Sequence, residues 1–171
     1  WITGASSGIG KALAIKFSSL GANLVLSSRN EDELLKVANK CSNETLIIPL
    51  DLAKQDNFTE ATKKVCEKFK SIDYLINNGG ISQRSKATET NLEVDRLLME
   101  INYFGTIALT KTVLPIMQNQ QRGHIITISS LSGKFGFFLR SAYAAAKFAQ
   151  VGFFESLRLE EEKNKINVSI V

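Results

Sequence analysis

Short runs of apolar residues alternate along the chain with longer segments in which apolar residues recur every three or four positions. A short apolar run bounded by turn residues is typical of a buried strand, and the longer period is typical of a helix with one buried face. Strands are therefore expected at residues 1–2, 23–28, 45–50, 74–76, 124–129 and 166–171. Helices are expected at residues 11–20, 31–41, 58–69, 92–118 with a break near 102–105, and 141–162.

The expected strands and helices alternate throughout with short links, and the strands are almost continuously apolar. This arrangement predicts an α/β fold in which a parallel sheet is covered by helices on both faces. In the first helix the residues at helical spacing are Ile9, Leu13, Phe17 and Leu20, and Gly21 is expected to end the helix. No repeat or linker divides the 171 residues, so we expect one domain.

Composition excludes several classes of protein. Hydrophobic residues make up 44% of the chain and charged residues 22%, which is typical of a globular protein and not of a disordered one. The net charge is only +4, and the basic residues are scattered among acidic ones, so no nucleic-acid partner is expected. No apolar stretch reaches 18 residues, so no transmembrane helix is expected within the sequence. Cys41 and Cys66 fit no metal pattern, and we interpret them as reduced thiols in a chain without a metal site.

A glycine-rich turn lies between the first expected strand and the first helix. Gly4, Gly8 and Gly10 follow the strand closely, and this is the context that a dinucleotide-binding turn requires. Gly4 would permit the tight turn, Gly8 would let backbone N–H groups approach a pyrophosphate, and Gly10 would let the helix pack closely. The spacing differs from the simple G-x-G-x-x-G form.

Tyr143 and Lys147 are the best candidates for proton transfer. They are four residues apart in an expected helix, so both side chains lie on one face. A fixed ammonium group near a phenol favours the ionised phenol, and the Ser130 hydroxyl at the end of the fifth strand could bind a substrate oxygen. Taken alone, the Tyr and Lys could also be an ordinary surface pair.

Five motifs in order resemble the short-chain dehydrogenase/reductase family. They are TGASSGIG at 3–10, NNGG at 77–80, Asn102 within EINYFG, the ISS that ends at Ser130, and YAAAK at 143–147. The resemblance covers nearly all 171 residues, and it is greatest to the dehydrogenase/reductase member 7 subgroup, including its 7B-like branch. It implies that residues 1–171 form an NADP(H)-binding catalytic domain with a Rossmann-type, doubly wound parallel sheet. Both ends of the domain are expected to be truncated, at the start of the first strand and before a C-terminal substrate-binding region.

The resemblance also implies roles for four residues. Ser130 would orient the substrate carbonyl, and Tyr143 would act as the general acid in reduction and the general base in oxidation. Lys147 would bind the nicotinamide ribose and strengthen Tyr143 as an acid. Asn102 would hold a water molecule that connects Lys147 to solvent as a proton relay. The alternative for Asn102 is that it only satisfies backbone groups at a helix break.

The end of the second strand predicts which cofactor is preferred. Ser28 stands where an NAD-binding site usually has Asp or Glu, and Arg29 follows it. A hydroxyl and a guanidinium group would accept a 2′-phosphate, so NADP(H) is predicted over NAD(H), although Arg29 could also be a solvated loop residue. Asp51 resembles the residue of the family that contacts adenine, with a helix N-cap as the alternative. The full predicted cofactor-binding set is Gly4, Ser6, Ser7, Gly8, Ile9, Gly10, Ser28, Arg29, Asp51, Leu52, Asn78, Gly79, Gly80, Tyr143 and Lys147.

The substrate prediction depends on aromatic residues between Ser130 and Tyr143. Phe135, Phe137 and Phe138 suggest a small apolar substrate such as a steroid, a retinoid or a lipid-like ketone. These aromatics could equally pack against a missing segment or a partner subunit. The alternative function is a protein of the same fold that binds cofactor but is catalytically silent, as a scaffold or regulator. A ketoacyl reductase acting on an acyl carrier would need a basic docking patch, and none is evident.

Partners and location follow only from the resemblance. The family forms homo-oligomers through helices that correspond to residues 92–118 and 141–162, and Val151, Phe153 and Phe154 would suit such an interface unless they face the sheet. The subgroup tends to carry an N-terminal membrane anchor, which would precede this sequence and place the protein inside the cell, at the endoplasmic reticulum membrane. The single histidine, at position 124, is interpreted as structural.

Overall fold

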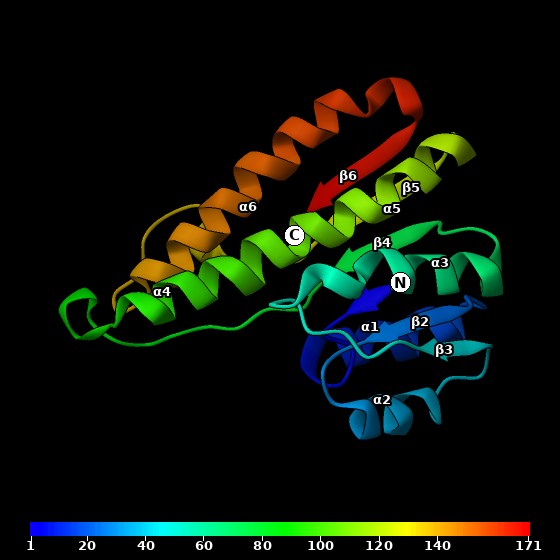
Figure 1. Ribbon diagram of the computed structural model, residues 1–171, viewed down its shortest axis with the longest axis horizontal. Helices are drawn as coiled ribbons and strands as arrows, with labels where there is room; N and C mark the ends of the chain where they lie inside the picture. Colours follow the sequence, from blue (N-terminus) through cyan, green and yellow to red (C-terminus); the bar gives the residue numbers. More distant parts are fainter.

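Six parallel strands form one sheet in the order β3-β2-β1-β4-β5-β6 (Figure 1). The structure is a computed structural model, and it describes residues 1–171. The strands are β1 (Ile2–Thr3), β2 (Leu24–Ser27), β3 (Thr45–Ile47), β4 (Tyr74–Asn77), β5 (Gly123–Thr127) and β6 (Ile166–Ile170). This order confirms the predicted doubly wound α/β fold, because the chain starts in the middle of the sheet and extends it to one edge and then to the other.

Each of the first five strands is followed by a helical segment that crosses back over the sheet. The helices are α1 (Gly8–Ser19), α2 (Glu31–Ala38), α3 (Phe58–Phe69), α4 (Leu92–Met99), a π-helical segment η3 (Glu100–Gly105), α5 (Thr106–Gln120) and α6 (Ser141–Glu160). Short 3₁₀ turns are η1 (Gln55–Asn57), η2 (Ala87–Glu89), η4 (Leu131–Gly133) and η5 (Glu162–Asn164). None of the helices combines the length and the apolar composition that crossing a membrane would require.

The core is divided into two parts by the sheet. The larger part lies under α3, α5 and α6, and the smaller part lies under α1 and α2. Strand β2 shows why both parts form, since Val25 packs into the larger cluster whereas Leu24 and Leu26 pack into the smaller one. A strand with apolar side chains on both faces is typical of a buried parallel sheet.

Strand β6 differs from the expected continuously apolar pattern. Ile166 and Val168 are buried against α6, whereas Asn167 between them is exposed. On this exposed face the Nε2 atom of His124 is 2.8 Å from the hydroxyl of Ser169. The apolar residues of β6 are therefore confined to one face of the strand, and polar groups line the other.

Helix α1 buries only part of the face that its apolar residues suggested: Leu13 and Phe17 are half-buried against the smaller core cluster. Gly10, Ala14 and Ser18 are its buried residues. Ile9 and Leu20 are 58% and 69% exposed, so they do not belong to the buried face. Small residues form the contact because the helix lies close to the strand that precedes it.

The predicted break in the long helix is a π-helical turn. Helices α4 and α5 flank η3 and form one nearly continuous rod across the molecule (Figure 1). Helix α5 continues through Pro115 to Gln120, two residues beyond the predicted end. Segments with i to i+5 hydrogen bonds often mark functional sites, and this one contains Asn102.

Strands β1 and β4 are neighbours that lead to opposite halves of the sheet. In a doubly wound sheet, ligands bind beyond the carboxyl ends of the strands at this change of direction. The glycine turn follows β1 there, and the segment 77–80 follows β4. The topology thus brings two predicted motifs that are more than 60 residues apart to one edge of the sheet.

Candidate active site

The glycine turn is shaped by a close contact with the end of β4. Gly4 has a φ of +63°, a conformation that L side chains rarely adopt. A Cβ atom on Gly10 would lie 2.3 Å from the carbonyl oxygen of Gly4 and 2.6 Å from Nδ2 of Asn78. Asn78 holds the turn in place, because its Nδ2 donates to the carbonyl oxygens of Thr3 at 3.0 Å and Gly4 at 3.2 Å. Only glycine fits at position 10.

The first turn of α1 is free to bind an anion. Its N-cap residue, Ser7, makes no side-chain hydrogen bond to the helix, and no acidic residue lies in the first turn. A Cβ atom on Gly8 would meet nothing within 4 Å, so its backbone is open to the cavity. The first N–H groups of a helix carry partial positive charge and need acceptors, which a pyrophosphate would supply.

A cavity of about 890 Å³ extends from this turn along the carboxyl edge of the sheet. Twelve predicted cofactor-binding residues line it: Gly4, Ser6, Ser7, Gly8, Ile9, Ser28, Arg29, Asp51, Leu52, Asn78, Gly79 and Gly80. The predicted set fits a dinucleotide at this edge, although Gly10 lies beneath the turn and Tyr143 and Lys147 lie beyond this cavity. A second cavity, of about 750 Å³ around Trp1 at another part of the sheet, contains none of the predicted site residues.

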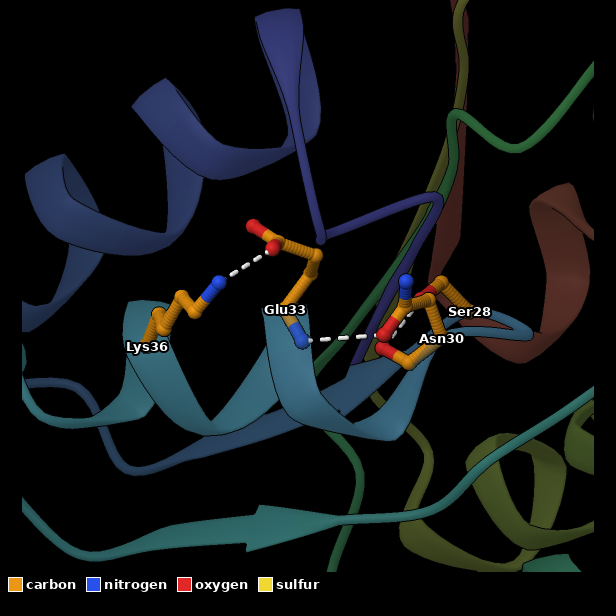
Figure 2. Close-up of polar contacts among 4 residues, drawn as sticks. All are labelled: Ser28, Asn30, Glu33 and Lys36. Carbon is orange, nitrogen blue, oxygen red and sulfur yellow. Dashed lines mark hydrogen bonds and ion pairs between the residues drawn. The ribbon is translucent and has the colours of Figure 1, made fainter.

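One end of the cavity is formed by the start of α2, whose polar contacts are shown in Figure 2. The Ser28 hydroxyl donates to the carbonyl oxygen of Asn30 at 3.3 Å, and Oδ1 of Asn30 caps the helix by accepting from the Glu33 N–H at 3.1 Å. The Glu33 carboxylate accepts a hydrogen bond from Lys36 at 2.5 Å, and this bond holds the pKa of Glu33 below its usual value. Arg29 is exposed in the cavity and forms no ion pair, so its guanidinium is available to an anionic ligand.

Asp51 closes its own turn after β3. Its Oδ1 accepts a hydrogen bond from the N–H of Ala53 at 3.0 Å, and its side chain lines the cavity. The N-cap position of α3 belongs to Asn57, so the alternative interpretation of Asp51 as the cap of that helix is wrong. The carboxylate retains acceptor capacity toward the cavity.

Lys147 is buried beside Tyr143. Its side chain is 5% exposed, and Nζ lies 5.8 Å from the centroid of the Tyr143 ring. Nζ donates to the carbonyl oxygen of Ile128 at 2.8 Å and to Oε1 of Gln150 at 3.0 Å. Burial disfavours the charged ammonium and lowers the pKa of Lys147 from its ordinary 10.5 to about 8. The pair is therefore not an ordinary surface pair.

Tyr143 and Ser130 line a smaller cavity of about 450 Å³. The Ser130 Oγ atom accepts a hydrogen bond from the N–H of Ser132 at 3.1 Å, so its own proton remains available to a substrate oxygen. Phe137 and Phe138 line the same cavity, and Phe138 is 85% exposed. Tyr143 and Ser130 thus share this cavity with Phe137 and Phe138, whereas Lys147, Asn102 and Phe135 do not line it.

Asn102 joins η3 to the loop after β4. Its Oδ1 accepts from the N–H of Ile81 at 2.8 Å, and its Nδ2 donates to the carbonyl oxygen of Ile81 at 2.9 Å. The Asn102 side chain is fully buried, and both of its polar atoms find hydrogen-bond partners in the backbone of Ile81. Its backbone carbonyl accepts a hydrogen bond from Nε2 of Gln150. Asn102 thus connects to Lys147 through the Gln150 side chain, and the proton relay through Asn102 stays a prediction.

Comparison with known proteins identifies the family. A sequence profile described as short chain dehydrogenase matches residues 1–171. The chain belongs to this family. It is 46% identical over 167 residues to dehydrogenase/reductase SDR family member 7 of Mus musculus, a match that covers 94% of this chain and 49% of that protein. It is 40% identical over 177 residues to member 7B of the same organism, covering 99% of this chain and 55% of that protein.

A solved structure has the same fold. The crystal structure of a metagenomic short-chain oxidoreductase in complex with NADP is 31% identical and has a TM-score of 0.95, covering 99% of this chain and 78% of that chain. These matches confirm the predicted resemblance to the short-chain dehydrogenase family and to its member 7 subgroup. The chain spans about half the length of these curated relatives. Short-chain dehydrogenases are nicotinamide-dinucleotide oxidoreductases, and the roles of the individual site residues stay predictions.

Two residues near the catalytic candidates were missed from the sequence. Gln150 follows Tyr143 and Lys147 at spacings of seven and three, which place all three on one helix face, and this is the signal that could have identified it. Arg140 donates through Nη1 to the hydroxyl of Ser82 and to the carbonyl oxygen of Gln83 at 2.7 Å. Its guanidinium lies 6.0 Å from the centroid of the Tyr143 ring. Nothing in the local sequence indicates that contact.

His124 occupies a structural position. Besides its contact with Ser169, its ring lies 5.7 Å from the ring of Tyr74, and burial lowers the pKa of the imidazole. Cys41 and Cys66 are both free thiols. No three of the side chains that commonly ligate metals lie together.

Proposed function

We propose that this short-chain dehydrogenase interconverts a carbonyl and an alcohol on a small apolar molecule, such as a steroid, a retinoid or a lipid-like ketone, with NADP(H). The observation that carries the proposal is the desolvated Lys147 ammonium beside the Tyr143 ring, at a cavity that Tyr143 shares with Ser130. A buried, unpaired cation next to a phenol has a chemical use that a structural pair would not need.

Ser130, Tyr143 and Lys147 each have a separate role in the proton transfer. In reduction, the Ser130 hydroxyl donates a hydrogen bond to the substrate carbonyl oxygen, and Tyr143 transfers its phenolic proton to the same oxygen. The Lys147 ammonium stabilises the phenolate that remains. When bound, the nicotinamide dinucleotide supplies the hydride in reduction and accepts it in oxidation. In oxidation the Tyr143 phenolate takes the proton from the alcohol.

The preference for NADP(H) rests on Arg29 and Ser28. Arg29 is exposed in the cavity without an acidic partner, and the place usually held by a carboxylate in NAD-binding sites is a serine. The double variant Ser28→Asp, Arg29→Ala should therefore bind NADH more tightly than NADPH, which reverses the order expected for the wild type. Arg96→Ala, which changes an exposed arginine on α4, serves as the control. A double variant that still prefers NADPH would show that other residues select the cofactor.

The apolar substrate is supported by the lining of the smaller cavity. Leu131, Phe137 and Phe138 are exposed there, next to Tyr143. The full chain should oxidise NADPH in the presence of steroid, retinoid or long-chain ketones, and Tyr143→Phe should abolish the reaction. Tyr74→Phe removes a hydroxyl outside this cavity and should leave the rate unchanged. Equal rates for wild type and Tyr143→Phe would contradict the mechanism, and tight cofactor binding without turnover on any carbonyl would favour a catalytically silent protein.

We propose also that the protein forms homo-oligomers through the outer face of α4, η3 and α6, which pack side by side. Leu97, Phe104 and Phe148 are between 46% and 47% exposed on these elements. Phe154, which the sequence suggested for such an interface, is fully buried in the core instead. Sedimentation should give a dimer or larger species for the wild type and a monomer for Phe104→Glu. Attachment to the endoplasmic reticulum membrane stays a prediction from the resemblance.

A further inference from the structure

Gln150 is a buried polar side chain on α6. It is 1% exposed and is one of the largest fully buried side chains of the protein. Burying a primary amide is unfavourable unless its donors and its acceptor find partners. Every polar atom of Gln150 has one: Oε1 accepts from Lys147 Nζ at 3.0 Å, and Nε2 donates to the Asn102 carbonyl oxygen and, at 3.4 Å, to Oγ1 of Thr106.

The contacts fix the ammonium group of Lys147. An ammonium has three N–H donors. Two of them are directed to acceptors from different elements, the carbonyl oxygen of Ile128 after β5 and Oε1 of Gln150 on α6, which leaves one donor without a partner in the protein. Without Gln150 the ammonium would keep one acceptor, and its position beside Tyr143 would be set by one contact only.

We propose that Gln150 is a positioning residue of the reaction, which connects the backbone of η3 at Asn102 to Lys147 and holds the ammonium beside Tyr143. The inference rests on the proposed function for its catalytic meaning. Gln150 does not reach the substrate cavity. It acts through Lys147.

Gln150 also stabilises the charge of Lys147. The groups that face Nζ are the Tyr143 ring from its own helix, the neutral carbonyl of Ile128 from β5, and the amide of Gln150, which links it to η3. Arg140 is the other cation near Tyr143, and no carboxylate forms an ion pair with Lys147. Burial already lowers the pKa of Lys147 to about 8. Losing a hydrogen bond to a charged group should lower it further, by about one pH unit.

Two variants separate positioning from packing. Gln150→Leu keeps most of the side-chain volume but removes the acceptor and excludes water. Gln150→Ala opens a space bordered by Lys147 Nζ, the Asn102 carbonyl and the Thr106 hydroxyl, which are enough polar partners to hold a water molecule. A packing role predicts that Ala is the more damaging change, because it leaves a cavity. A positioning role predicts that Leu is the more damaging change.

The test is the pKa of Lys147 in the full chain, measured by NMR of protein labelled with ¹³C-lysine and assigned from the signal lost in Lys147→Arg. We expect Gln150→Leu to lower this pKa by about one pH unit and Gln150→Ala to lower it less. At neutral pH, turnover should fall by about tenfold for Leu and by less for Ala. An unchanged pKa in Gln150→Leu, or a larger change in Ala than in Leu, would overturn the proposal. The NMR result decides the role of Gln150 even if the wild type reduces no carbonyl, which would refute only the proposed function.

Discussion

Replacing Gly10 by alanine should displace the glycine turn that precedes α1. The new Cβ atom would lie 2.3 Å from the Gly4 carbonyl oxygen and 2.6 Å from Nδ2 of Asn78, about 1 Å closer than ordinary contact. Neither neighbour can move freely, because Gly4 is in a tight turn at φ +63° and Asn78 is hydrogen bonded to the backbone carbonyls of Thr3 and Gly4.

The expected cost can be stated as a free energy of unfolding. Overpacking a close contact costs about 1–3 kcal/mol. The higher helix propensity of alanine compared with glycine offsets up to about 1 kcal/mol of this cost. At the middle of these ranges the net loss is about 1.5 kcal/mol, so Gly10→Ala should unfold about 3–6 °C below the wild type, since 1 kcal/mol corresponds to about 2–4 °C for a domain of this size. The displaced turn should also weaken NADPH binding by about tenfold or more.

Gly152→Ala is the matched control. Gly152 lies in the middle of α6, and a Cβ atom there would meet nothing within 4 Å. The same substitution should stabilise the protein by about 0.5–1 kcal/mol and leave NADPH binding unchanged. Thermal unfolding and the fluorescence of bound NADPH measure both effects. If Gly10→Ala unfolds and binds NADPH like the wild type, the turn is not held as described.

Two further predictions test the electrostatics and the loop of the site. Because unfolded Lys147 keeps its proton up to about pH 10.5 and the folded residue loses it near pH 8, the unfolded state binds more protons between these values, and stability should rise with pH across that range. Relative to Lys147→Met, the free energy of unfolding of the wild type should rise by about 3 kcal/mol across this pH range, at about 1.4 kcal/mol per pH unit. If urea unfolding shows the same pH dependence for the wild type and for Lys147→Met, Lys147 is not a buried lysine that titrates in this range. Asn102→Ala removes both hydrogen bonds to Ile81 and should lower the free energy of unfolding by about 2 kcal/mol. The control is Asn91→Ala, at an exposed residue without side-chain hydrogen bonds, which should have no effect. Equal free energies of unfolding for the two variants would argue against the hydrogen-bonded link between η3 and the loop after β4.

The fold could be predicted from the sequence because the apolar pattern and the glycine turn agreed. The bounds of α3 were predicted correctly, since its apolar residues recur at a regular helical spacing and the chain turns sharply at Lys70. The buried face of α1 was not predictable in the same way. Its contact with the sheet is made by small residues such as Gly10 and Ala14, whereas Ile9 faces the cofactor cavity. Hydrophobicity alone does not show where two backbones approach closely.

The candidate site was predicted in its parts but not in its connections. Tyr143, Lys147 and Ser130 could be named because five motifs occur in the order typical of the family, although the Tyr and Lys taken alone could have been a surface pair. The contact of Gln150 with the Asn102 carbonyl depends on how η3 packs against α6, 48 residues apart, and no local pattern encodes that packing. The hydrogen bond from Arg140 to Ser82 could not be predicted either, because it also joins residues that are far apart in the sequence.

The most direct test of the proposed reaction is hydride transfer itself. The full chain is incubated with NADPH that carries deuterium at the transferable position of the nicotinamide and with a ketone that the wild type reduces, and the alcohol product is analysed by mass spectrometry. We predict that deuterium appears on the former carbonyl carbon with the wild type and with Tyr74→Phe, and that Tyr143→Phe forms no product although it still binds NADPH. Product formed by Tyr143→Phe at the wild-type rate, or a wild-type product without deuterium, would contradict the account.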